Sequence, residues 1–366
     1  MNLAFIQRLD QIGGGSRVSL RSTMWTLREH RPDWQLSLVT QSRGPLSEAA
    51  LEQGISWVSS SLPRFRKPLS RFVFWRDCRR LASRLSGTSL NAIVSNEWVT
   101  APHARAVAKC LKIPAISYVR DFIAVERGRK YLLHRMDRLL CVSESMRVAM
   151  IEAGYDPAKL KTVYNPVLKP VVQEPDPQLL QKIKCAGARR WLLYLGRISS
   201  RKNQIDAVET LKHLRKFSKQ DWGLLIVGDE DEDYAKRLED RIAASGLSGR
   251  ALKLGMISQP GWLIDMVDAS VLTSKSEGLA RVLIESFLMR IPAFSYPMAG
   301  VEDVYGENLK DFVSQEGDPE ALARIIAEHI DAEGTRRKTE LLGDFLTYRH
   351  SVSNHVREFE KAVGTE

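Results

Sequence analysis

Short apolar runs alternate with helical patterns along the whole chain, and this alternation limits the folds that the sequence can adopt. Runs typical of buried strands cover residues 3–6, 36–40, 55–58, 92–95, 115–119, 139–142 and 162–164, and further ones follow at 191–195, 223–227 and 269–273. Strands separated by helices form parallel βαβ units, which build doubly wound α/β sheets. Ligands of such sheets bind outside the carboxyl ends of the strands, so the loops that follow these runs are candidate sites.

The length of the chain and its proline-rich middle predict two domains. The 366 residues suffice for two domains of ordinary size. Three prolines loosen the helical pattern between residues 169 and 178. We therefore expect a first domain over 1–168, a linker over 169–190, a second domain over 191–340 and a helical segment over 341–366.

The excess of positive charge lies in the first half of the chain. Residues 1–170 hold 27 Lys and Arg against 13 Asp and Glu, whereas the whole chain has a formal net charge of +10. Phosphates, an anionic membrane surface and nucleic acid are all open as partners of this half.

The sequence lacks the patterns of a membrane span, a signal peptide or a disulfide framework. No apolar run approaches 18 residues, and the first residues lack the basic and apolar regions of a signal peptide. Four cysteines are scattered without metal-like spacing, at Cys78, Cys110, Cys141 and Cys185. We therefore expect a cytoplasmic protein.

The segment 275–285 combines a glycine turn, a helix start and two carboxylates. Gly278 lets the backbone turn closely, and we expect a helix from Leu279. Eight helical steps of about 1.5 Å would separate Glu277 from Glu285 by roughly 12 Å along the axis, too far for a glycosidase pair. Free N–H groups between them could seat phosphate, so a nucleotide sugar would fit. The simpler alternative is a surface helix that carries two acids.

Two other loops place glycine at the end of a predicted strand. Gly196 and Arg197 follow the strand at 191–195, and Lys202 comes five residues after Arg197. The run Gly13–Gly15 stands between the first strand and a predicted helix over 18–28, the layout of a phosphate-binding turn. This glycine run matches neither a Walker loop nor a complete dinucleotide fingerprint, which disfavours a Rossmann oxidoreductase. A tight turn without a ligand is the alternative.

These motifs, in this order and spacing, resemble the retaining glycosyltransferases of family four (glycosyl transferases group 1). The resemblance implies an α/β protein with the GT-B fold, in which two Rossmann-like doubly wound domains face each other across a cleft. It implies that the second domain binds a nucleotide-diphospho-sugar, that the first binds the acceptor, and that the last helices cross back onto the first domain. The donor-binding residues would be Gly14, Gly15, Gly196, Arg197, Lys202, Gly228, Glu277, Gly278, Leu279, Ala280 and Glu285.

The same resemblance assigns roles to the charged residues. Arg197 and Lys202 would stabilise the departing diphosphate, because fixed cations bind the charge that accumulates in the transition state. Glu277 would hold the donor sugar and Glu285 the ribose. The sugar would be transferred with retention, without an enzyme nucleophile, a metal or a cofactor, from a UDP- or GDP-linked donor.

Arg120 and Asp121 follow the strand predicted at 115–119. The family often has a His-Asp pair at this place, near the reacting sugar. This chain has Arg120 where the histidine is common, so the role of that histidine is not assigned to Arg120. Arg120 could meet a phosphate or an acidic acceptor. A salt bridge within the loop is the alternative.

Residues 63–85 carry eight basic side chains and one acid, with aromatic residues between them. From residue 69 the pattern is helical, with Phe72, Trp75, Arg76 and Arg79 about one turn apart. A core helix with a solvated basic face, contact with an anionic membrane and contact with nucleic acid all remain open.

We expect an enzyme of cell-envelope glycan or glycolipid synthesis, with a glycan or lipid-linked acceptor and a place on the inner face of the membrane. A nucleotide-sugar-binding protein, or a related epimerase or phosphorylase, would keep the fold and change the chemistry. A nucleic-acid-binding protein would explain the basic half but not the Glu277 and Glu285 spacing.

Overall fold

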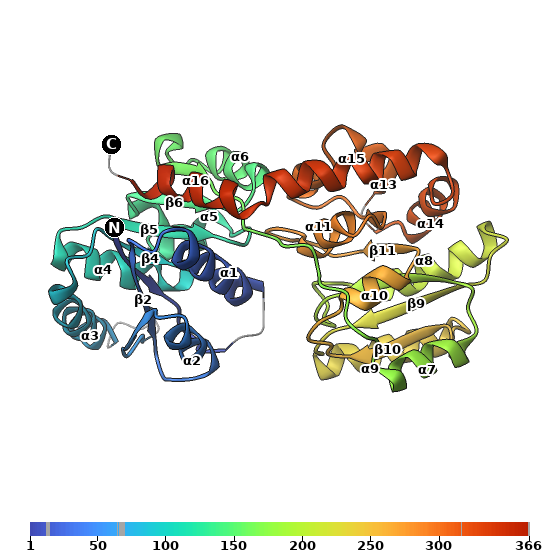
Figure 1. The fold of residues 1–366 in the computed structure, drawn as a ribbon, viewed down its shortest axis with the longest axis horizontal. Helices are drawn as coiled ribbons and strands as arrows, with labels where there is room; N and C mark the ends of the chain where they lie inside the picture. The colour runs from blue at the N-terminus through green and yellow to red at the C-terminus, as the bar shows by residue number, and fades with distance from the viewer. Residues whose placement is uncertain (12–14, 64, 66–69, 316, 365–366) are drawn as a thin grey trace. The chain divides into compact units, whose positions relative to one another are not determined.

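The computed structural model describes residues 1–11, 15–63, 65, 70–315 and 317–364, and the chain forms two compact units (Figure 1). The first unit joins Met1–Pro166 to His350–Glu366, and the second is Val167–Arg349. Within the described part of the chain, no helix is long and apolar enough to cross a membrane.

Seven parallel strands form the sheet of the first unit. Each strand is short. Four of the five residues of β1 are buried, as expected for a parallel strand that is covered on both faces. The strand order is β3-β2-β1-β4-β5-β6-β7, so the chain leaves β1 towards one edge and β4 towards the other. The strands are β1 (Asn2–Ile6), β2 (Gln35–Thr40), β3 (Ser56–Ser59), β4 (Ala92–Ser95), β5 (Ala115–Val119), β6 (Arg138–Cys141) and β7 (Leu160–Thr162).

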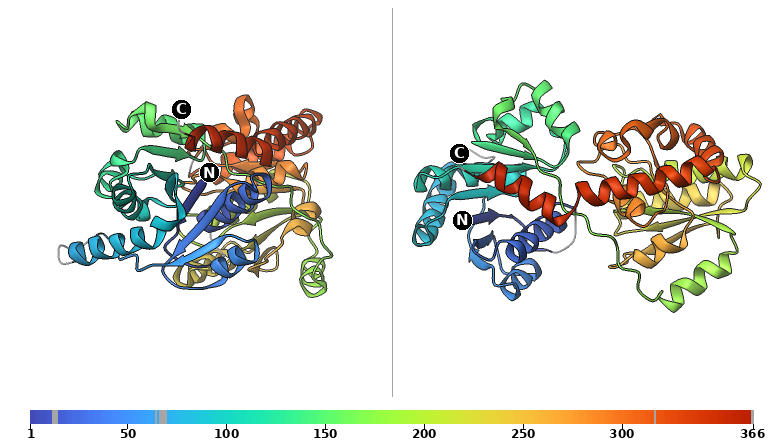
Figure 2. Two further views of the ribbon diagram at one scale, coloured as in Figure 1. Left: turned by 60° about the vertical axis from the view of Figure 1, so that its left-hand side comes forward. Right: turned by 45° about the horizontal axis from the view of Figure 1, so that its top comes forward.

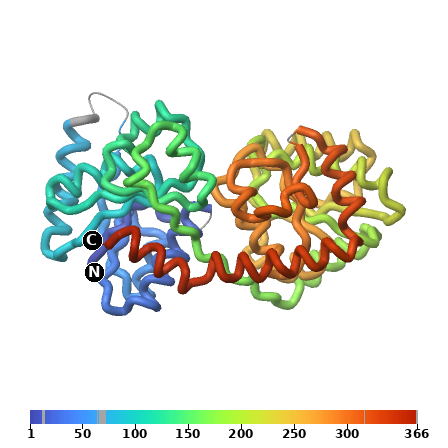
Figure 3. The backbone as a smooth tube through the Cα atoms, turned by 90° about the horizontal axis from the view of Figure 1, so that it is seen from above, coloured from blue at the N-terminus to red at the C-terminus, as the bar shows by residue number. Residues whose placement is uncertain are grey.

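Helices cover both faces of this first sheet (Figure 2). Helices α3 and α4 pack together on one face, and α16, the last helix of the chain, contacts α1 and β6 (Figure 3). The helices are α1 (Gly15–His30), α2 (Pro45–Glu52), α3 (Ser70–Leu85), α4 (Ala101–Leu111), α5 (Val125–Lys130), α6 (Glu144–Glu152) and α16 (Val352–Val363).

The second unit has a five-stranded parallel sheet in the order β10-β9-β8-β11-β12. Its strands are β8 (Arg190–Leu195), β9 (Trp222–Val227), β10 (Ala251–Gly255), β11 (Ala269–Leu272) and β12 (Ala293–Ser295). Its helices are α7 (Pro177–Ala186), α8 (Gln204–Phe217), α9 (Glu232–Ala244), α10 (Gly261–Met266), α11 (Arg281–Leu288), α12 (Val301–Tyr305), α13 (Leu309–Phe312), α14 (Pro319–His329) and α15 (Glu333–Arg349). Two doubly wound α/β sheets are therefore present, as the alternation of strands and helices predicts.

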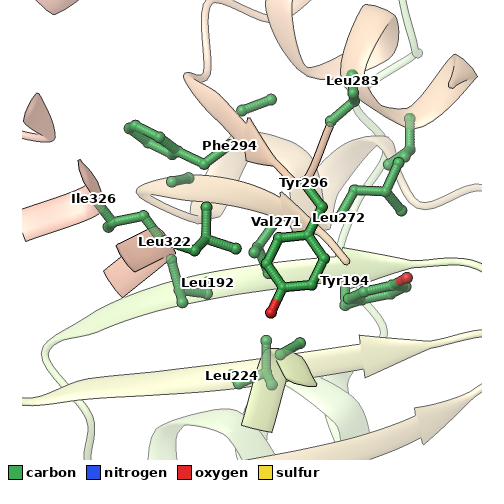
Figure 4. Packing of buried hydrophobic residues seen from close by; sticks show 14 of the residues in the cluster. Leu192, Tyr194, Leu224, Val271, Leu272, Leu283, Phe294, Tyr296, Leu322 and Ile326 are labelled. Atoms are coloured by element: carbon green, nitrogen blue, oxygen red, sulfur yellow. The ribbon is translucent and has the colours of Figure 1, made fainter. Parts of the chain in front are cut away.

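The strands of the second sheet are apolar throughout because both faces are covered. Along β8, Leu192 and Tyr194 belong to one hydrophobic cluster, while Trp191 and Leu193 belong to another. Figure 4 shows the first cluster, in which Leu192 and Tyr194 lie near residues from β9, β11 and the helices. Adjacent strand residues point to opposite faces, so a doubly covered strand reads as a continuous apolar run.

The predicted linker over 169–190 is wrong in its second half. Helix α7 starts within it, and the helix buries Ile183 in the core of the second unit. Asp176 caps the helix start by accepting hydrogen bonds from two backbone N–H groups, and Gly187 ends the helix in a left-handed conformation. The sequence signals of this helix are Asp176 directly before Pro177 at its start and Gly187 directly after its end.

Two other boundaries differ from the prediction. The helical segment predicted over 341–366 consists of two helices. Helix α15 already starts at Glu333 and belongs to the second unit, whereas α16 belongs to the first. The strand predicted at 162–164 ends at Thr162. The next carbonyls leave the sheet, because those of Tyr164 and Asn165 accept hydrogen bonds from His355 and His350.

Candidate functional site

The ends of β8 and β9 each carry a glycine, and at Gly228 the strands approach each other too closely for any side chain. Gly196 and Gly228 both have φ of +154°. A Cβ atom on Gly228 would lie 2.2 Å from the carbonyl oxygen of Gly196, and one on Gly196 would lie 3.4 Å from Cε of Lys202. These two glycines therefore allow the strand ends and the loops that follow them to pack closely.

The loop that carries Lys202 is tied to the strand and loop of the 275–285 segment. The backbone N–H of Lys275 donates to the carbonyl of Arg201 at 2.9 Å, and the hydroxyl of Thr273 donates to the carbonyl of Asn203 at 2.7 Å. The phenol of Tyr194 donates to the carbonyl of Lys202. The two loops predicted as separate motifs thus form one surface.

Lys202 and Glu277 form an ion pair at the centre of this surface. The Lys202 Nζ lies 2.5 Å from Glu277 Oε1, and the two side chains are 14% and 8% exposed. A pair so little exposed is screened less by salt than a surface pair. The structure therefore brings together the two residues predicted to act at the diphosphate and at the sugar.

Arg201 also contacts Glu277, and the sequence analysis missed it. Its Nη1 donates to the carbonyl of Ser276 at 2.7 Å and lies 3.4 Å from Glu277 Oε2. The only signal in the sequence was a basic residue directly before Lys202, which is too common to assign a role. Both carboxylate oxygens of Glu277 thus face a cation.

Arg197 lies apart from this pair. Its side chain is 59% exposed, and its guanidinium lies 3.8 Å from Asp229 Oδ2. Beside it, a hollow of about 660 Å³ is lined by Gly228, Asp229, Lys253 and Met256, among others. The cation predicted in this loop is therefore exposed and contacts Asp229, which lines the hollow.

Helix α11 begins at Arg281 rather than at Leu279, which corrects the predicted geometry. Gly278, Leu279 and Ala280 form a non-helical turn, and Ala280 has φ of −77° and ψ of 69°. Glu277 therefore precedes the helix, and the separation of about 12 Å along one helix axis does not apply. Glu285 is the member of the carboxylate pair that α11 carries.

Glu285 is paired with Arg281 one helical turn earlier. The Arg281 Nη2 donates to Glu285 Oε1 at 3.2 Å, and the two side chains are 24% and 22% exposed. Burial raises the pKa of the Glu285 carboxyl, and Arg281 opposes this change by stabilising the charged form.

In the first unit, Arg120 is buried in a network of carboxamides. Its Nε donates to Asn96 Oδ1 at 2.8 Å and its Nη1 to Asn165 Oδ1 at 2.7 Å, while the guanidinium lies 4.0 Å from the ring centroid of Tyr118. Asn96 in turn donates to Gln7 Oε1 at 2.6 Å. The predicted loop salt bridge does not account for these contacts, since Arg120 joins the ends of β4, β5 and the segment after β7.

The other predicted residues of the first unit stand as follows. Asp121 is exposed directly after Arg120. Gly15 is the first residue of α1, and Gly14 lies outside the described residues. Of the stretch 63–85, residues 64 and 66–69 also lie outside the described part.

Helix α3 has one buried face and one exposed basic and aromatic face. Phe74 and Cys78 are buried, whereas Phe72 is 78% exposed and Trp75 is 42% exposed. The exposed face also carries Arg76 and its basic neighbours Arg79 and Arg80. A core helix with a solvated face is therefore present, and the exposed aromatic residues need a further explanation.

Comparison with known proteins identifies both halves of the chain. Residues 13–167 match the model of Glycosyltransferase Family 4, and residues 177–340 match that of Glycosyl transferases group 1. The crystal structure of Anabaena Alr3699/HepE in complex with UDP and glucose superposes with a TM-score of 0.83 at 18% identity, covering all of both chains. At this identity, the likeness concerns the fold.

Two curated relatives match part of the chain. The lipopolysaccharide 1,6-galactosyltransferase of Escherichia coli K12 is 24% identical over 54% of this chain and 53% of its own length. The Vi polysaccharide biosynthesis protein VipC/TviE of Salmonella typhi is 25% identical over 39% of this chain and 25% of its own length. The chain thus spans about half or less of these relatives. From the two family models and the shared architecture, the chain belongs to the group 1 glycosyltransferases and has the GT-B fold.

Proposed function

We propose that this protein transfers a hexose from a nucleotide-diphospho-sugar to a hydroxyl group of a glycan or glycolipid, with retention at the anomeric carbon. The observation that carries the proposal is the Lys202–Glu277 pair, which joins the two motif loops at 2.5 Å beside Gly196 and Gly228. A cation for a diphosphate and a carboxylate for sugar hydroxyls stand side by side there.

Each charged residue has a defined task in the proposed reaction. The bond between the anomeric carbon and the diphosphate oxygen breaks, and its electron pair remains on the diphosphate. The acceptor oxygen bonds to the same face of that carbon, and its proton passes to the leaving diphosphate. Lys202 and Arg197 bind the charge that accumulates on the diphosphate, and Glu277 orients the sugar through its hydroxyls.

The known proteins support the class of donor and the biological setting. The Anabaena structures hold UDP and UDP-glucose, which favours a uridine nucleotide as the first donor to examine. The two curated relatives act in the synthesis of lipopolysaccharide and of Vi polysaccharide, which favours a cell-envelope glycan as the product. The hollow lined by Gly228 and Met256 offers space for the nucleoside.

The test is a panel of UDP-, GDP- and ADP-sugars, with release of the nucleoside diphosphate and thermal stabilisation followed together. We expect one nucleotide class to stabilise the protein and to be hydrolysed slowly without an acceptor. Well-folded protein that responds to no member of the panel would contradict the proposed donor. Stabilisation without transfer to any glycan acceptor would favour a nucleotide-sugar-binding protein.

We further propose that the exposed face of α3 rests on an anionic membrane, where a lipid-linked acceptor would be found. Phe72 and Trp75 would enter the interface, while Arg76, Arg79 and Arg80 would meet the lipid phosphates. Nucleic acid is the competing partner for the same face, since its phosphates would meet the arginines and its bases would stack on Phe72 and Trp75.

Co-sedimentation with phosphatidylglycerol vesicles at low salt tests the membrane contact. We expect binding that falls when Arg76, Arg79 and Arg80 are replaced by glutamine, and that falls again with Phe72→Ser. Binding that is absent, or that ignores both changes, would contradict the proposal. Steeply salt-dependent binding to RNA or DNA would instead favour nucleic acid.

A further inference from the structure

One N–H group of the Arg281 guanidinium is buried without a hydrogen-bond partner among the described residues. Its Nη2 donates to Glu285 Oε1, but Nη1 is buried and has no hydrogen-bond partner among the described residues. Native proteins rarely keep a buried donor unpaired, because the group has lost its water without gaining another acceptor. An acceptor from outside the chain would explain this arrangement.

Both carboxylates of the site are paired with a cation, Glu277 with one from another loop and Glu285 with one from its own helix. Lys202 occupies Oε1 of Glu277, and Arg281 occupies Oε1 of Glu285. Each carboxylate that the proposed function assigns to the donor is thus already bonded to a cation of the protein itself. A donor that takes the Oε1 position of either carboxylate displaces the cation that holds it.

We propose that Arg281 is a donor-binding residue whose guanidinium exchanges the Glu285 carboxylate for oxygens of the donor diphosphate. This inference rests on the proposed function, since it assumes a nucleotide-diphospho-sugar at the site. After the exchange, Oε1 of Glu285 is open to a ribose hydroxyl, and Nη1 of Arg281 has an anionic acceptor. The guanidinium of Arg281 keeps an anionic partner in the diphosphate, whereas the Glu285 carboxylate, whose side chain is 22% exposed, exchanges its cation for hydrogen bonds from neutral ribose hydroxyls.

A second pair in the same unit shows what a purely structural role looks like. Arg336 and Glu340 on α15 have the same order and spacing as Arg281 and Glu285, with 3.4 Å between Nε and Oε1. The Arg336 side chain is 87% exposed, so water satisfies its other N–H groups, whereas that of Arg281 is 24% exposed. Arg336 is therefore the matched control for Arg281.

Isothermal titration of UDP, GDP and ADP, each beside its nucleoside, tests the exchange in the full chain. We expect Arg281→Met to weaken binding of the diphosphate that the unmodified protein prefers by about 10- to 100-fold, the effect of one or two charge-assisted hydrogen bonds. The affinity for the matching nucleoside should change by less than about twofold. Arg336→Met should bind both compounds as the unmodified protein does, and Arg281→Lys should recover part of the loss.

The outcomes separate this inference from the proposed function. An unchanged affinity of Arg281→Met for the diphosphate overturns the inference and leaves the proposed donor intact. An equal loss for nucleoside and diphosphate overturns it as well, because Arg281 would then act only through Glu285 and the ribose. If Arg281→Met does not fold, Arg281→Lys decides, since unaltered diphosphate affinity without the guanidinium contradicts the exchange. Unmodified protein that binds none of the three diphosphates overturns the proposed function itself.

Discussion

At the carboxyl edge of the first sheet, Arg120 is buried and donates to two neutral carboxamides, Asn96 and Asn165. At the same edge of the second sheet, Lys202 and Arg281 are paired with the carboxylates Glu277 and Glu285 and keep some exposure to water. The first arrangement holds strand ends and a connecting segment together. The second consists of ion pairs that remain partly exposed, which is the arrangement that the proposed donor site requires.

The comparison extends to the histidines. In the first unit His103 and His355 are buried, and each has one ring nitrogen bonded to a backbone carbonyl. In the second unit His213 and His329 are partly exposed. His30 and His134 of the first unit are exposed, so the contrast concerns the buried histidines of that unit and the partly exposed ion pairs at the edge of the second sheet. Changes at the two edges should therefore fail in different ways.

The largest effect is expected from the Lys202–Glu277 pair. Replacing either residue by alanine should lower turnover by about 100- to 1,000-fold, because fixed charge at the leaving group and the sugar is lost. Each variant should still fold, with a lowered melting temperature, because removing one partner leaves the other little-exposed charge without its partner. Turnover with the donor identified in the panel, together with thermal unfolding, measures both quantities.

The control for this pair is Lys338→Met. Lys338 Nζ lies 2.7 Å from Asp311 Oδ2, in an ion pair outside the proposed site. This variant should retain full turnover. Full activity in Glu277→Ala or Lys202→Ala would remove the site assignment and, with it, the contrast between the two sheet edges.

Arg120 should matter first for stability. Arg120→Met removes charged donors from two buried carboxamides, which should lower the free energy of unfolding by about 3 kcal/mol. Arg120→Lys should recover part of this loss. Urea denaturation followed by tryptophan fluorescence gives the free energies. Unchanged stability with lost turnover would mean that Arg120 contacts the substrate, and the first edge would then resemble the second.

Acid should destabilise the first unit through its buried histidines. Burial lowers the pKa of both His103 and His355 to about 4, from an ordinary value of 6.5. Their stabilising contribution is complete above pH 6.5. This contribution is lost as the pH falls from 6.5 towards 4, because in this range the histidines bind protons in the unfolded chain but not in the folded one. The free energy of unfolding falls by up to about 1.4 kcal/mol per pH unit for each histidine.

Urea denaturation at pH 7 and pH 5 measures this loss. We expect His103→Gln and His355→Gln to reduce the difference between the two pH values, although each variant starts from a lower stability. An equal pH dependence in both variants would show that other groups carry it.

The smallest effects are expected at two helix caps, one in each unit. Ser351 accepts a hydrogen bond from the backbone N–H of Asn354 at the start of α16, and Asp176 does the same for Gln178 and Leu179 at the start of α7. Replacement of either by alanine should cost about 1 kcal/mol. Thermal unfolding measures the loss, and turnover should stay unchanged at a temperature where both variants are folded.

The cap in α7 also tests the corrected domain boundary. If residues 169–190 were only a linker, Asp176→Ala would leave the stability of the second unit unchanged. A measurable loss would show that α7 is part of that unit, as the burial of Ile183 indicates.

Local signals in the sequence were sufficient for much of the fold. Branched apolar runs predicted most strands to within one or two residues, because strands buried on both faces leave little room for polar side chains. The failures came where a distant segment decided the outcome. The strand at 162–164 ended early because the carbonyls of Tyr164 and Asn165 bond to His355 and His350, which lie about half the chain away in sequence.

For the site, residue types and spacing indicated Lys202, Glu277 and Glu285, since glycine at strand ends and charge in the next loop are local features. The sequence by itself determined the two doubly wound sheets and the positions of these motifs along the chain. Only the tertiary structure decided that Lys202 bonds to Glu277, that Arg201 contacts the same carboxylate, that Arg281 has a buried N–H group without a partner among the described residues, and that Arg120 is buried. The contacts of Lys202, Arg201 and Arg120 depend on how separate loops and strand ends meet at a sheet edge, and a spacing along the chain carries no information about those distances. The Arg281–Glu285 contact is local to one helix, but the buried N–H group of Arg281 is a feature of its tertiary environment.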